Sequence, residues 1–317
     1  MHLYGSTVAQ AARSVGDEAF ITAAAGHFTK VFGAAPSPQE VHSWRRSWPA
    51  LVAILRSAGL DGLHLLLEYA LPATGERIDA LILGKDTDGC LCAVAIELKQ
   101  WTHAQLRPDR PGMVRTAERV VQHPARQVGG YVHYLQQWVN RADFPLTARG
   151  TVVLHDAGAD LVAALRAPAA RGPAAAYPVL GRDDLTPQPS AQALAQRLGC
   201  AELSPAGRTD VERFLHAEHR PGAALLERAG EVIEGRDAFT LIGDQDLARQ
   251  EILHAVDGAR RQGTKSIIVV TGGPGTGKTV IACRLLGRVR CMIAFCPGLS
   301  GESEGRQRSV PVAGGFA

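Results

Sequence analysis

The sequence predicts an α/β protein with two domains. Two apolar segments, residues 76–83 and 91–99, flank a polar turn that contains Asp88-Gly89, a pattern typical of a β-hairpin. A segment with helical spacing follows, from residue 124 to about residue 140. Further along, the β-branched segment 266–270 leads into a glycine-rich loop and another helical segment. With 317 residues, of which 46% are hydrophobic, the chain can build a core in each of two domains.

Charge and hydropathy narrow the classes of partner. The net charge is only +3, so no global field attracts nucleic acid and any such contact must be local. No apolar segment approaches the roughly 20 residues that cross a bilayer. We therefore expect a cytoplasmic protein without membrane contact. Two groups of arginines are candidates for local contacts with nucleic acid, and the alternative is that they form an ordinary solvated surface. The first group is Arg45 and Arg46, and the second is Arg107, Arg110, Arg115, Arg119 and Arg126.

Helices are expected before the first strand. Residues 1–33 have helical spacing and carry no motif. The sequence Ser37-Pro38-Gln39-Glu40 matches a capping box with proline at the first helical position, so it predicts a helix to about residue 46. A second helix is expected from Ser47 to Ala58. The first strand then covers residues 64–71 and carries Glu68, for which we favour a position at the strand surface over a role in a site.

The second strand of the hairpin ends in a pair of charged residues. Because side chains alternate along a strand, Glu97 and Lys99 lie on one face, and the alternate positions 94, 96 and 98 point into a core. An ion pair on an edge strand is the commoner explanation for an isolated Glu-x-Lys pattern. The pair therefore needs further residues before it indicates a site.

Asp79, in the first strand of the hairpin, can supply such a residue. If the turn pairs Leu83 with Leu91, Asp79 lies opposite Ala95, on the face of Glu97 and diagonal to it. Two carboxylates in this arrangement can share one Mg²⁺ or Mn²⁺ ion. A neighbouring lysine can then assist a water molecule that the metal activates. The hairpin thus predicts a metal site with Asp79 and Glu97 as ligands.

A helical segment after the hairpin adds two polar residues in a fixed order. Gln127 and Tyr131 are four residues apart and so share one helix face. Together with Asp79 and the Glu-x-Lys strand, this order resembles the PD-(D/E)XK nuclease superfamily, and the Gln-x-x-x-Tyr helix resembles its RecB-type members. The resemblance covers roughly residues 40–160. It implies a restriction-endonuclease-like core, a mixed sheet flanked by helices, that cleaves DNA or RNA with Mg²⁺ or Mn²⁺.

The same resemblance implies a role for each residue of the pattern. Asp79 and Glu97 would bind the metal, and Lys99 would assist the attacking water. Gln127 and Tyr131 would position the nucleic-acid strand. Members of this superfamily can keep the fold without the activity, so a domain that only grips nucleic acid is the alternative.

Several weaker patterns delimit the first domain. Residues 103–122 are polar and rich in arginine, and we expect a loop there. A buried strand is expected at 150–155, and another strand at 177–180 in a segment rich in Ala, Pro, Gly and Arg. Helices at 191–198 and 209–219 follow. We place the first domain at residues 1–200 and a helical linker at residues 201–236.

The second domain, residues 237–287, contains a phosphate-binding pattern. After a helix at residues 246–261 and a strand at 266–270, the glycine-rich loop matches a Walker A sequence in the required context of strand, loop and helix. Its backbone N–H groups would surround the phosphates of ATP, Lys278 would reach the β- and γ-phosphates, and the Thr279 hydroxyl would hold Mg²⁺. The loop consists of Gly272, Gly273, Pro274, Gly275, Thr276, Gly277, Lys278 and Thr279.

Residues ahead of this loop extend the resemblance. The segment Phe239 to Gln245 is similar to the Q-motif of superfamily one helicases, in which the glutamine reads the adenine edge. A RecB-like domain followed by a Q-motif and a Walker A loop resembles the bacterial Schlafen group 3-like DNA/RNA helicases. This resemblance covers most of the chain up to about Gly287. It implies the first strand, loop and helix of a P-loop NTPase domain, and a setting such as phage defence or repair.

The end of the sequence departs from that family. No aspartate follows Asp257, and the 38 residues after Thr279 contain no acidic residue behind an apolar strand, so a Walker B motif is absent. We expect ATP binding without turnover, a disordered or aberrant segment at residues 288–317, and a truncated relative of the helicases. A Mg²⁺-dependent nuclease is the favoured interpretation. The alternatives are a nucleotide-responsive protein that binds nucleic acid without cleaving it, and an inactive gene fragment.

Overall fold

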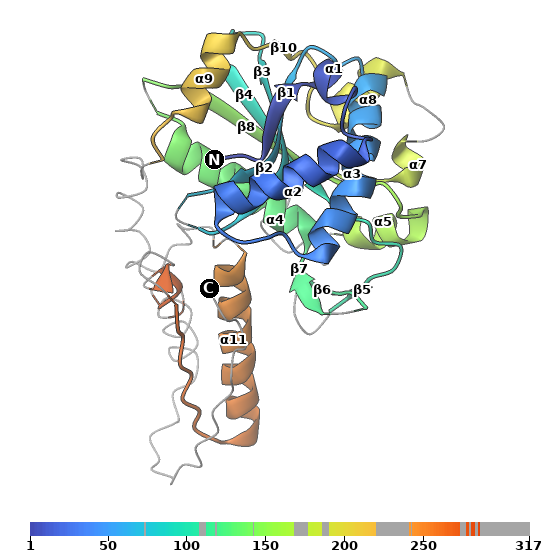
Figure 1. Ribbon diagram of the computed structural model, residues 1–317. Helices are drawn as coiled ribbons and strands as arrows, with labels where there is room; N and C mark the ends of the chain where they lie inside the picture. The colour runs from blue at the N-terminus through green and yellow to red at the C-terminus, as the bar shows by residue number, and fades with distance from the viewer. Residues whose placement is uncertain are drawn as a thin grey trace. The chain divides into compact units, whose positions relative to one another are not determined.

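The computed structural model divides the chain into two units, Met1–Gly222 and Ala223–Ala317, which are described separately (Figure 1). The residues described are 1–72, 74–107, 112–117, 119–141, 143–167, 177–185, 190–219, 241, 243–272, 277–278, 280–282 and 285. The helices of the first unit are α1 (Val8–Ala11), α2 (Glu18–Phe32), α3 (Pro38–Ser57), α4 (Pro124–Tyr134) with the π-helical turn η1 (Leu135–Val139), α5 (Ala159–Arg166), α7 (Arg182–Leu185), α8 (Ala191–Arg197) and α9 (Arg208–Leu215). Its strands are β1 (Tyr4–Thr7), β2 (His64–Ala70), β3 (Arg77–Lys85), β4 (Leu91–Leu98), β5 (Gln105–Leu106), β6 (Met113–Arg115), β7 (Val120–Gln122), β8 (Leu146–Leu154), β9 (Val179–Gly181) and β10 (Ser204–Pro205).

A mixed sheet forms the centre of the first unit. Its strand order is β1-β2-β3-β4-β8-β9, and β10 pairs with the end of β3. Neighbouring strands from β1 to β4 are antiparallel to one another, whereas β8 pairs in parallel with β4 and β9 in parallel with β8. Helix α4 lies in the connection between the parallel strands β4 and β8 and packs on both. The α/β class with a mixed sheet between helices is therefore confirmed.

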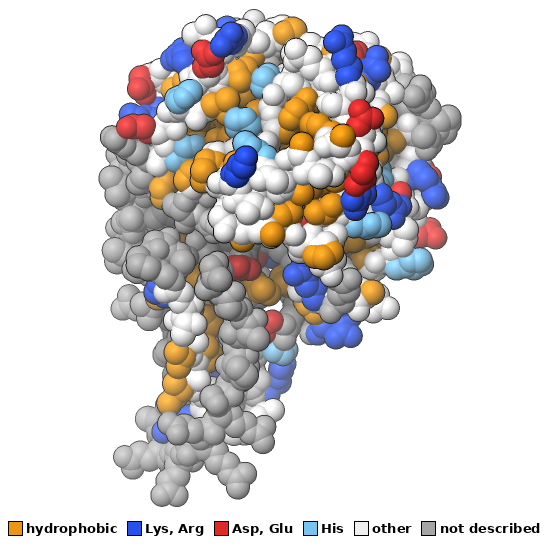
Figure 2. Space-filling view, in the orientation of Figure 1, with side chains coloured by type: hydrophobic (Ala, Val, Ile, Leu, Met, Phe, Trp, Pro, Cys, Tyr) orange, Lys and Arg blue, Asp and Glu red, His pale blue; other side chains and the backbone are white. Residues whose placement is uncertain are grey.

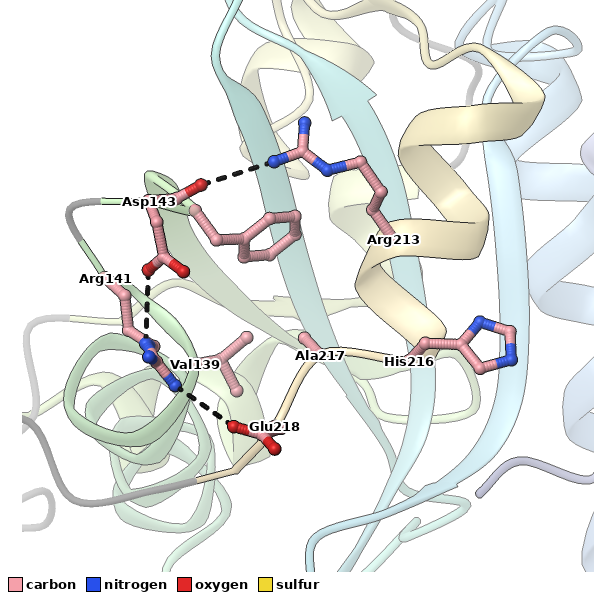
Figure 3. Close-up of a pocket in the computed structure, with 8 residues that line it drawn as sticks. Val139, Arg141, Asp143, Arg213, His216, Ala217 and Glu218 are labelled. Carbon is pink, nitrogen blue, oxygen red and sulfur yellow. Dashed lines mark hydrogen bonds and ion pairs between the residues drawn. The ribbon is translucent and has the colours of Figure 1, made fainter.

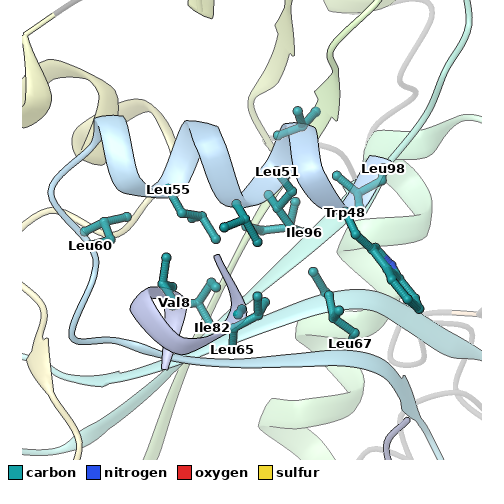
Figure 4. Close-up of a cluster of buried hydrophobic side chains, with 14 of the residues drawn as sticks. Val8, Trp48, Leu51, Leu55, Leu60, Leu65, Leu67, Ile82, Ile96 and Leu98 are labelled. Atoms are coloured by element: carbon teal, nitrogen blue, oxygen red, sulfur yellow. The ribbon is translucent and has the colours of Figure 1, made fainter. Parts of the chain in front are cut away.

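The main hydrophobic core lies between one face of this sheet and the helices α1, α2, α3 and α8 (Figure 4). Alternate residues of β3 and β4 supply the sheet side of this core, as the predicted alternation requires. The remaining positions of these strands are therefore available to the opposite face, which α4 covers. The strand side of the core includes Leu65, Leu67, Ala80, Ile82, Val94, Ile96 and Leu98.

Helix α3 begins as predicted but does not end where the sequence suggested. The capping box is present, since Ser37 accepts from the Glu40 backbone and Glu40 accepts from the Ser37 backbone. The predicted break near residue 47 is wrong, because α3 continues through Pro49 as one helix. Pro49 has no backbone N–H to donate within the helix, and the burial of a single apolar stripe along the helix compensates for this missing hydrogen bond. The stripe consists of Trp44, Trp48, Leu51 and Leu55.

Helix α4 approaches the sheet at a glycine. A Cβ added to Gly150 of β8 would clash with the side chain of Val128 and lie 3.0 Å from that of Val132. We therefore predict that Gly150→Ala lowers the free energy of unfolding by about 1–3 kcal/mol, because α4 must shift outward. Gly26 of α2 is the matched control, since its Cβ would meet open space and Gly26→Ala should stabilise the helix by about 0.5–1 kcal/mol. Urea unfolding measures both, and equal stabilities for the two variants would contradict the close approach.

Several boundaries differ from the sequence expectations. Strand β8 begins at Leu146 rather than near residue 150, because it pairs with β4 along its whole length. The expected loop at residues 103–122 instead contains a separate antiparallel sheet of β5, β6 and β7. The first unit also extends beyond residue 200. There β10 pairs with β3, and Phe214 of α9 packs its ring against Tyr69.

The second unit contains helix α11 (Asp244–Gln262) and a small apolar cluster. Residues 264–272 have no regular secondary structure, and among the described residues no strand pairs with them, so the predicted strand at 266–270 is wrong. The side chains of Ile267 and Val269 are about two-thirds exposed, whereas Ile268 packs on the cluster. The segment therefore lacks the hydrogen-bonded neighbour that defines a strand. Predictions for Phe239, Gly273–Thr276, Thr279 and 288–317 lie outside the described residues.

Candidate functional site

The hairpin register places Asp79 closer to Glu97 than the sequence suggested. Lys85, not Leu83, pairs with Leu91, so the expected position of Asp79 opposite Ala95 is wrong. Ala80 pairs with Ile96, and the continuation of this register sets Asp79 directly across from Glu97. The reason lies in the turn, where the Asp86 carboxylate accepts from the backbone N–H groups of Asp88 and Cys90. This turn needs only five residues, and β3 therefore continues two residues further than expected, to Lys85.

Hydrogen bonds fix the three charged side chains at this end of the hairpin. Asp79 Oδ2 accepts from the backbone N–H of Leu98 at 2.7 Å. Lys99 Nζ donates to Glu97 Oε1. The side chain of Gln100 donates to Ser47 Oγ of α3 at 2.7 Å, which anchors the chain directly after Lys99. Strand pairing and the hydrogen bond from Gln100 to α3 together hold the charged groups in place, so they are not free to rotate into solvent.

One oxygen of Glu97 has no hydrogen-bonding partner. Glu97 is completely buried, and no donor in the described part of the chain reaches its Oε2 atom. A buried carboxylate oxygen without a partner costs free energy, and native proteins rarely keep one without a reason. A bound cation would satisfy it. This oxygen is thus the atom of the cluster at which a cation would gain most.

Helix α4 brings the predicted polar pair to the same place. His123 caps the helix, with its Nδ1 accepting from the Ala125 backbone, and Pro124 occupies the first turn. Four residues on, Gln127 Nε2 donates to Tyr131 Oη at 2.6 Å. Tyr131 is fully buried. Burial raises the pKa of Tyr131, and the charges of Glu97 and Asp79 raise it further.

Burial dominates the electrostatics of this cluster. It raises the pKa of Glu97, and the charge of Asp79 raises it further, to about 8, against the opposing effect of Lys99. Burial also raises the pKa of Asp79, although Lys99 and the hydrogen bond from Leu98 oppose it. Burial opposes the charge on Lys99, but the carboxylates outweigh it and raise the pKa of Lys99. An added cation would relieve the repulsion between the two carboxylates.

Glu68 is buried near this cluster, so the surface position expected from the sequence is wrong. It is buried, it accepts from Trp44 Nε1 at 2.9 Å, and it lies 3.4 Å from Arg77 Nε. Burial and the charge of Asp79 raise the pKa of Glu68 to about 8, against the effect of Arg77. The signal available in the sequence was a single charged residue within a strand that is otherwise apolar.

The backbone at Glu68 is also unusual. Its φ of 50° lies in the left-handed region, which costs a residue with a side chain roughly 1–3 kcal/mol and persists where the surroundings enforce it. The enforcing contacts come from Arg77, which pairs with Glu40 of α3 and lies over the ring of Phe28, 4.6 Å from its centroid. The network of Trp44, Glu68 and Arg77 therefore ties the strand of Asp79 to α2 and α3.

The donor set fits a hard divalent cation with few protein ligands. In the described ranges, no group of three or more His, Cys, Asp or Glu side chains is placed to hold a metal. Asp79 and Glu97 supply two carboxylates, and Mg²⁺ commonly uses one or two carboxylates together with water and phosphate oxygens. The unpartnered Oε2 of Glu97 is the observation that supports a cation here.

In the second unit, the described residues of the glycine-rich loop lie close to the predicted glutamine. Gly277 has a φ of 83°, and a Cβ there would lie 2.6 Å from the side-chain nitrogen of Gln245. Lys278 Nζ donates to the backbone oxygen of Gly272 at 2.6 Å, across the loop. Gln245, Gly272, Gly277 and Lys278 are thus neighbours, and the four loop residues between Gly272 and Gly277 are not described.

A pocket of about 380 Å³ lies apart from the acidic cluster and shares none of its residues (Figure 3). Within it, Arg141 pairs with Asp143 at 3.3 Å and with Glu218 at 3.7 Å. Arg213 lies over the ring of Phe144. The charges of this pocket compensate one another, so we assign it no ligand.

Comparisons with known proteins give no relative. No family model, no curated protein and no solved structure matches the chain. Among the helices described, none is both long and apolar enough to span a bilayer. The function must therefore be argued from the residues of the site.

Proposed function

We propose that the first unit is a nuclease domain of the PD-(D/E)XK type, which hydrolyses phosphodiester bonds of DNA or RNA with Mg²⁺ or Mn²⁺. The observation that carries the proposal is the unpartnered, buried Oε2 of Glu97, directly across the hairpin from Asp79. Support comes from the hydrogen bond that Lys99 donates to Glu97 and from the buried Tyr131, whose pKa the charges of both carboxylates raise. An edge-strand ion pair, the simpler alternative, does not account for a fully buried glutamate that keeps one oxygen without a donor.

Each residue has a role that its position supports. Asp79 and Glu97 would hold the cation, which when bound supplies a Lewis acid for the phosphate and an activated water. Lys99 carries a stabilised positive charge beside Glu97, where it can hold a phosphate oxygen and steady the negative charge that develops. Tyr131, oriented by Gln127, can hydrogen-bond to the strand without losing its proton at neutral pH. The resemblance in sequence order supports the same assignment.

We propose a second activity for the other unit, namely binding of ATP. The contact of Gln245 with Gly277 favours it, since the glutamine that would read the adenine lies beside the loop that would hold the phosphates. Lys278 is also placed at this loop. The pairing of the two activities is the arrangement of the Schlafen group 3-like helicases that the sequence resembles, and a nucleic-acid-binding protein that responds to nucleotide remains the alternative to a nuclease.

If the first unit is a nuclease, the Mg²⁺ concentration that it needs for cleavage should depend on pH. Metal binding requires ionised carboxylates, and burial and Asp79 raise the pKa of Glu97 to about 8. Below this pKa, protons compete with the metal. The Mg²⁺ concentration that gives half-maximal cleavage should therefore rise up to about tenfold for each unit of pH lowered from 8 to 6, and level off above 8.

The measurement is the initial rate of cleavage of end-labelled DNA and RNA strands, titrated with Mg²⁺ at each pH. Rates at saturating metal are recorded in parallel, so that a pH effect on the chemical step is separated from the effect on metal binding. A half-maximal Mg²⁺ concentration that stays constant between pH 6 and 8 would contradict the buried carboxylate pair as the metal site. Absence of any cleavage with Mg²⁺ or Mn²⁺ would contradict the nuclease proposal itself.

A further inference from the structure

The small sheet of β5, β6 and β7 is inserted in the chain between the two elements that carry the proposed catalytic residues. We refer to the described residues of this sheet, 105–107, 112–117 and 119–122, as the arm. It begins six residues after Lys99, which follows β4, and it ends one residue before His123, the cap of α4. Trp101 lies at its root, with the Lys99 ammonium 5.9 Å from the centre of its ring. The arm is therefore connected on one side to Glu97 and Lys99 and on the other to Gln127 and Tyr131.

The arm is anchored in the body of the unit. Met113 and Val114 of β6 are buried, and the His123 backbone N–H donates to the oxygen of Gly112 at 2.9 Å. The Arg126 side chain lies so close to Gly112 that a Cβ there would clash with it. The middle strand, which ends at Arg115, is therefore held against the body of the unit.

Two arginines lie at that turn and face solvent. Arg115 ends β6 and Arg119 directly precedes β7, and both are exposed. The Thr116 backbone N–H donates to the Arg119 oxygen at 2.9 Å, which closes the turn and holds the two arginines on either side of it. Figure 2 shows Lys and Arg side chains over the region where Figure 1 places β5 to β7.

The segment also concentrates the charge of the chain. Residues 101–123 contain four arginines, one aspartate and one glutamate, which gives +2 of the +3 carried by all 317 residues. A local positive patch next to a phosphodiester-cleaving site is complementary to the nucleic-acid backbone, whose phosphates are its most strongly charged groups. A chain with so little net charge needs such a local contact to retain its substrate.

We propose that the arm binds the sugar-phosphate backbone of the nucleic-acid substrate beside the cleavage site, through Arg115 and Arg119. The proposal rests on the nuclease function proposed for the first unit. The contact is independent of base sequence, because guanidinium groups on phosphates read charge rather than base edges. It serves to hold the strand next to Lys99 and Tyr131 while the scissile phosphate is positioned.

The test compares two double variants of the full chain. Arg115→Gln/Arg119→Gln removes the guanidinium groups that would bind phosphate. Arg13→Gln/Arg208→Gln removes two exposed charges near α1 and α9, which Figure 1 shows at the end of the unit opposite the arm. Binding of a fluorescein-labelled single strand, as DNA and as RNA of one sequence, is followed by anisotropy with chelator present to prevent cleavage. Equal melting temperatures establish that both variants fold.

The arm variant should bind both strands roughly tenfold more weakly at about 100 mM salt. Its slope of log affinity against log salt should fall by about 1.4, or about 0.7 for each phosphate that the variant no longer neutralises. The control should stay within about twofold of the wild type. In cleavage, the defect of the arm variant should lie mainly in KM. A weaker affinity for only one of the two strands would overturn the backbone contact, since phosphates are common to both.

The outcomes separate this inference from the proposed function. If the wild type cleaves and the arm variant matches the control in affinity, salt slope and KM, the arm inference is wrong and the nuclease proposal stands. If the wild type binds neither strand and cleaves neither, both are wrong. If the wild type binds with the expected salt slope, the arm variant shows the reduced slope and neither protein cleaves, the arm inference stands and the nuclease proposal fails.

Discussion

Replacement of Glu97 by glutamine is expected to reduce Mg²⁺-dependent cleavage at least about 10³-fold. The substitution keeps the size of the side chain but removes the negative charge that would bind the metal, and with it both the activated water and the neutralised phosphate charge. Glu97 is fully buried, so water cannot easily replace the missing ligand oxygen. Initial rates on a labelled strand at saturating Mg²⁺ measure the effect.

The control must separate loss of the metal from loss of the fold. Glu97→Gln leaves the Lys99 ammonium with Asp79 alone, and an unpaired buried charge is itself destabilising. The double variant Glu97→Gln/Lys99→Gln removes both charges and should melt closer to the wild type while remaining inactive. Glu18→Gln, at an exposed ion pair on α2, should retain full activity. Wild-type cleavage by a folded Glu97→Gln protein would show that the metal site is assigned to the wrong residue.

Replacement of Lys278 by alanine is expected to weaken ATP binding by about 10- to 100-fold. A charge-assisted hydrogen bond from an ammonium to phosphate contributes about 1.5–3 kcal/mol, and Lys278 is already directed across the loop toward Gly272. Calorimetric titration with ATP and Mg²⁺ measures the affinity. Lys265→Ala removes an exposed lysine of the same unit and should leave the affinity within about twofold.

The same titration tests the role assigned to the glycine-rich loop. Equal affinities for wild type and Lys278→Ala would contradict a phosphate-binding role for the lysine. Turnover of ATP by the wild type that disappears in Lys278→Ala would contradict the expectation of binding without hydrolysis.

Local patterns in the sequence were sufficient for much of the site. The alternation in β4 predicted that Glu97 and Lys99 share a face, and the four-residue spacing predicted that Gln127 and Tyr131 do, which their hydrogen bond confirms. The capping box predicted the start of α3. These features depend on residues within a few positions of one another, where backbone geometry alone determines the outcome.

Features that depend on distant contacts were not predictable. The hairpin register was wrong by two residues because the Asp86 carboxylate shortens the turn. Glu68 was expected at the strand surface, but its buried position depends on Trp44 and Arg77, and Trp44 is 24 positions away. The arm was expected to be a loop because its strands are only two or three residues long, and the buried side chains of β6 hold it in place.

Cleavage assays with the purified full chain test directly whether Asp79 and Glu97 form a metal-dependent phosphodiesterase site. End-labelled DNA and RNA strands are incubated with wild type, with Asp79→Asn, and with Asp61→Asn at an exposed ion pair on the surface, each with Mg²⁺ and with chelator. Wild type and Asp61→Asn should cleave the strands only when the metal is present, and Asp79→Asn should not cleave them. Cleavage that persists with chelator, or that is equal in all three proteins, would contradict the assignment of this metal site.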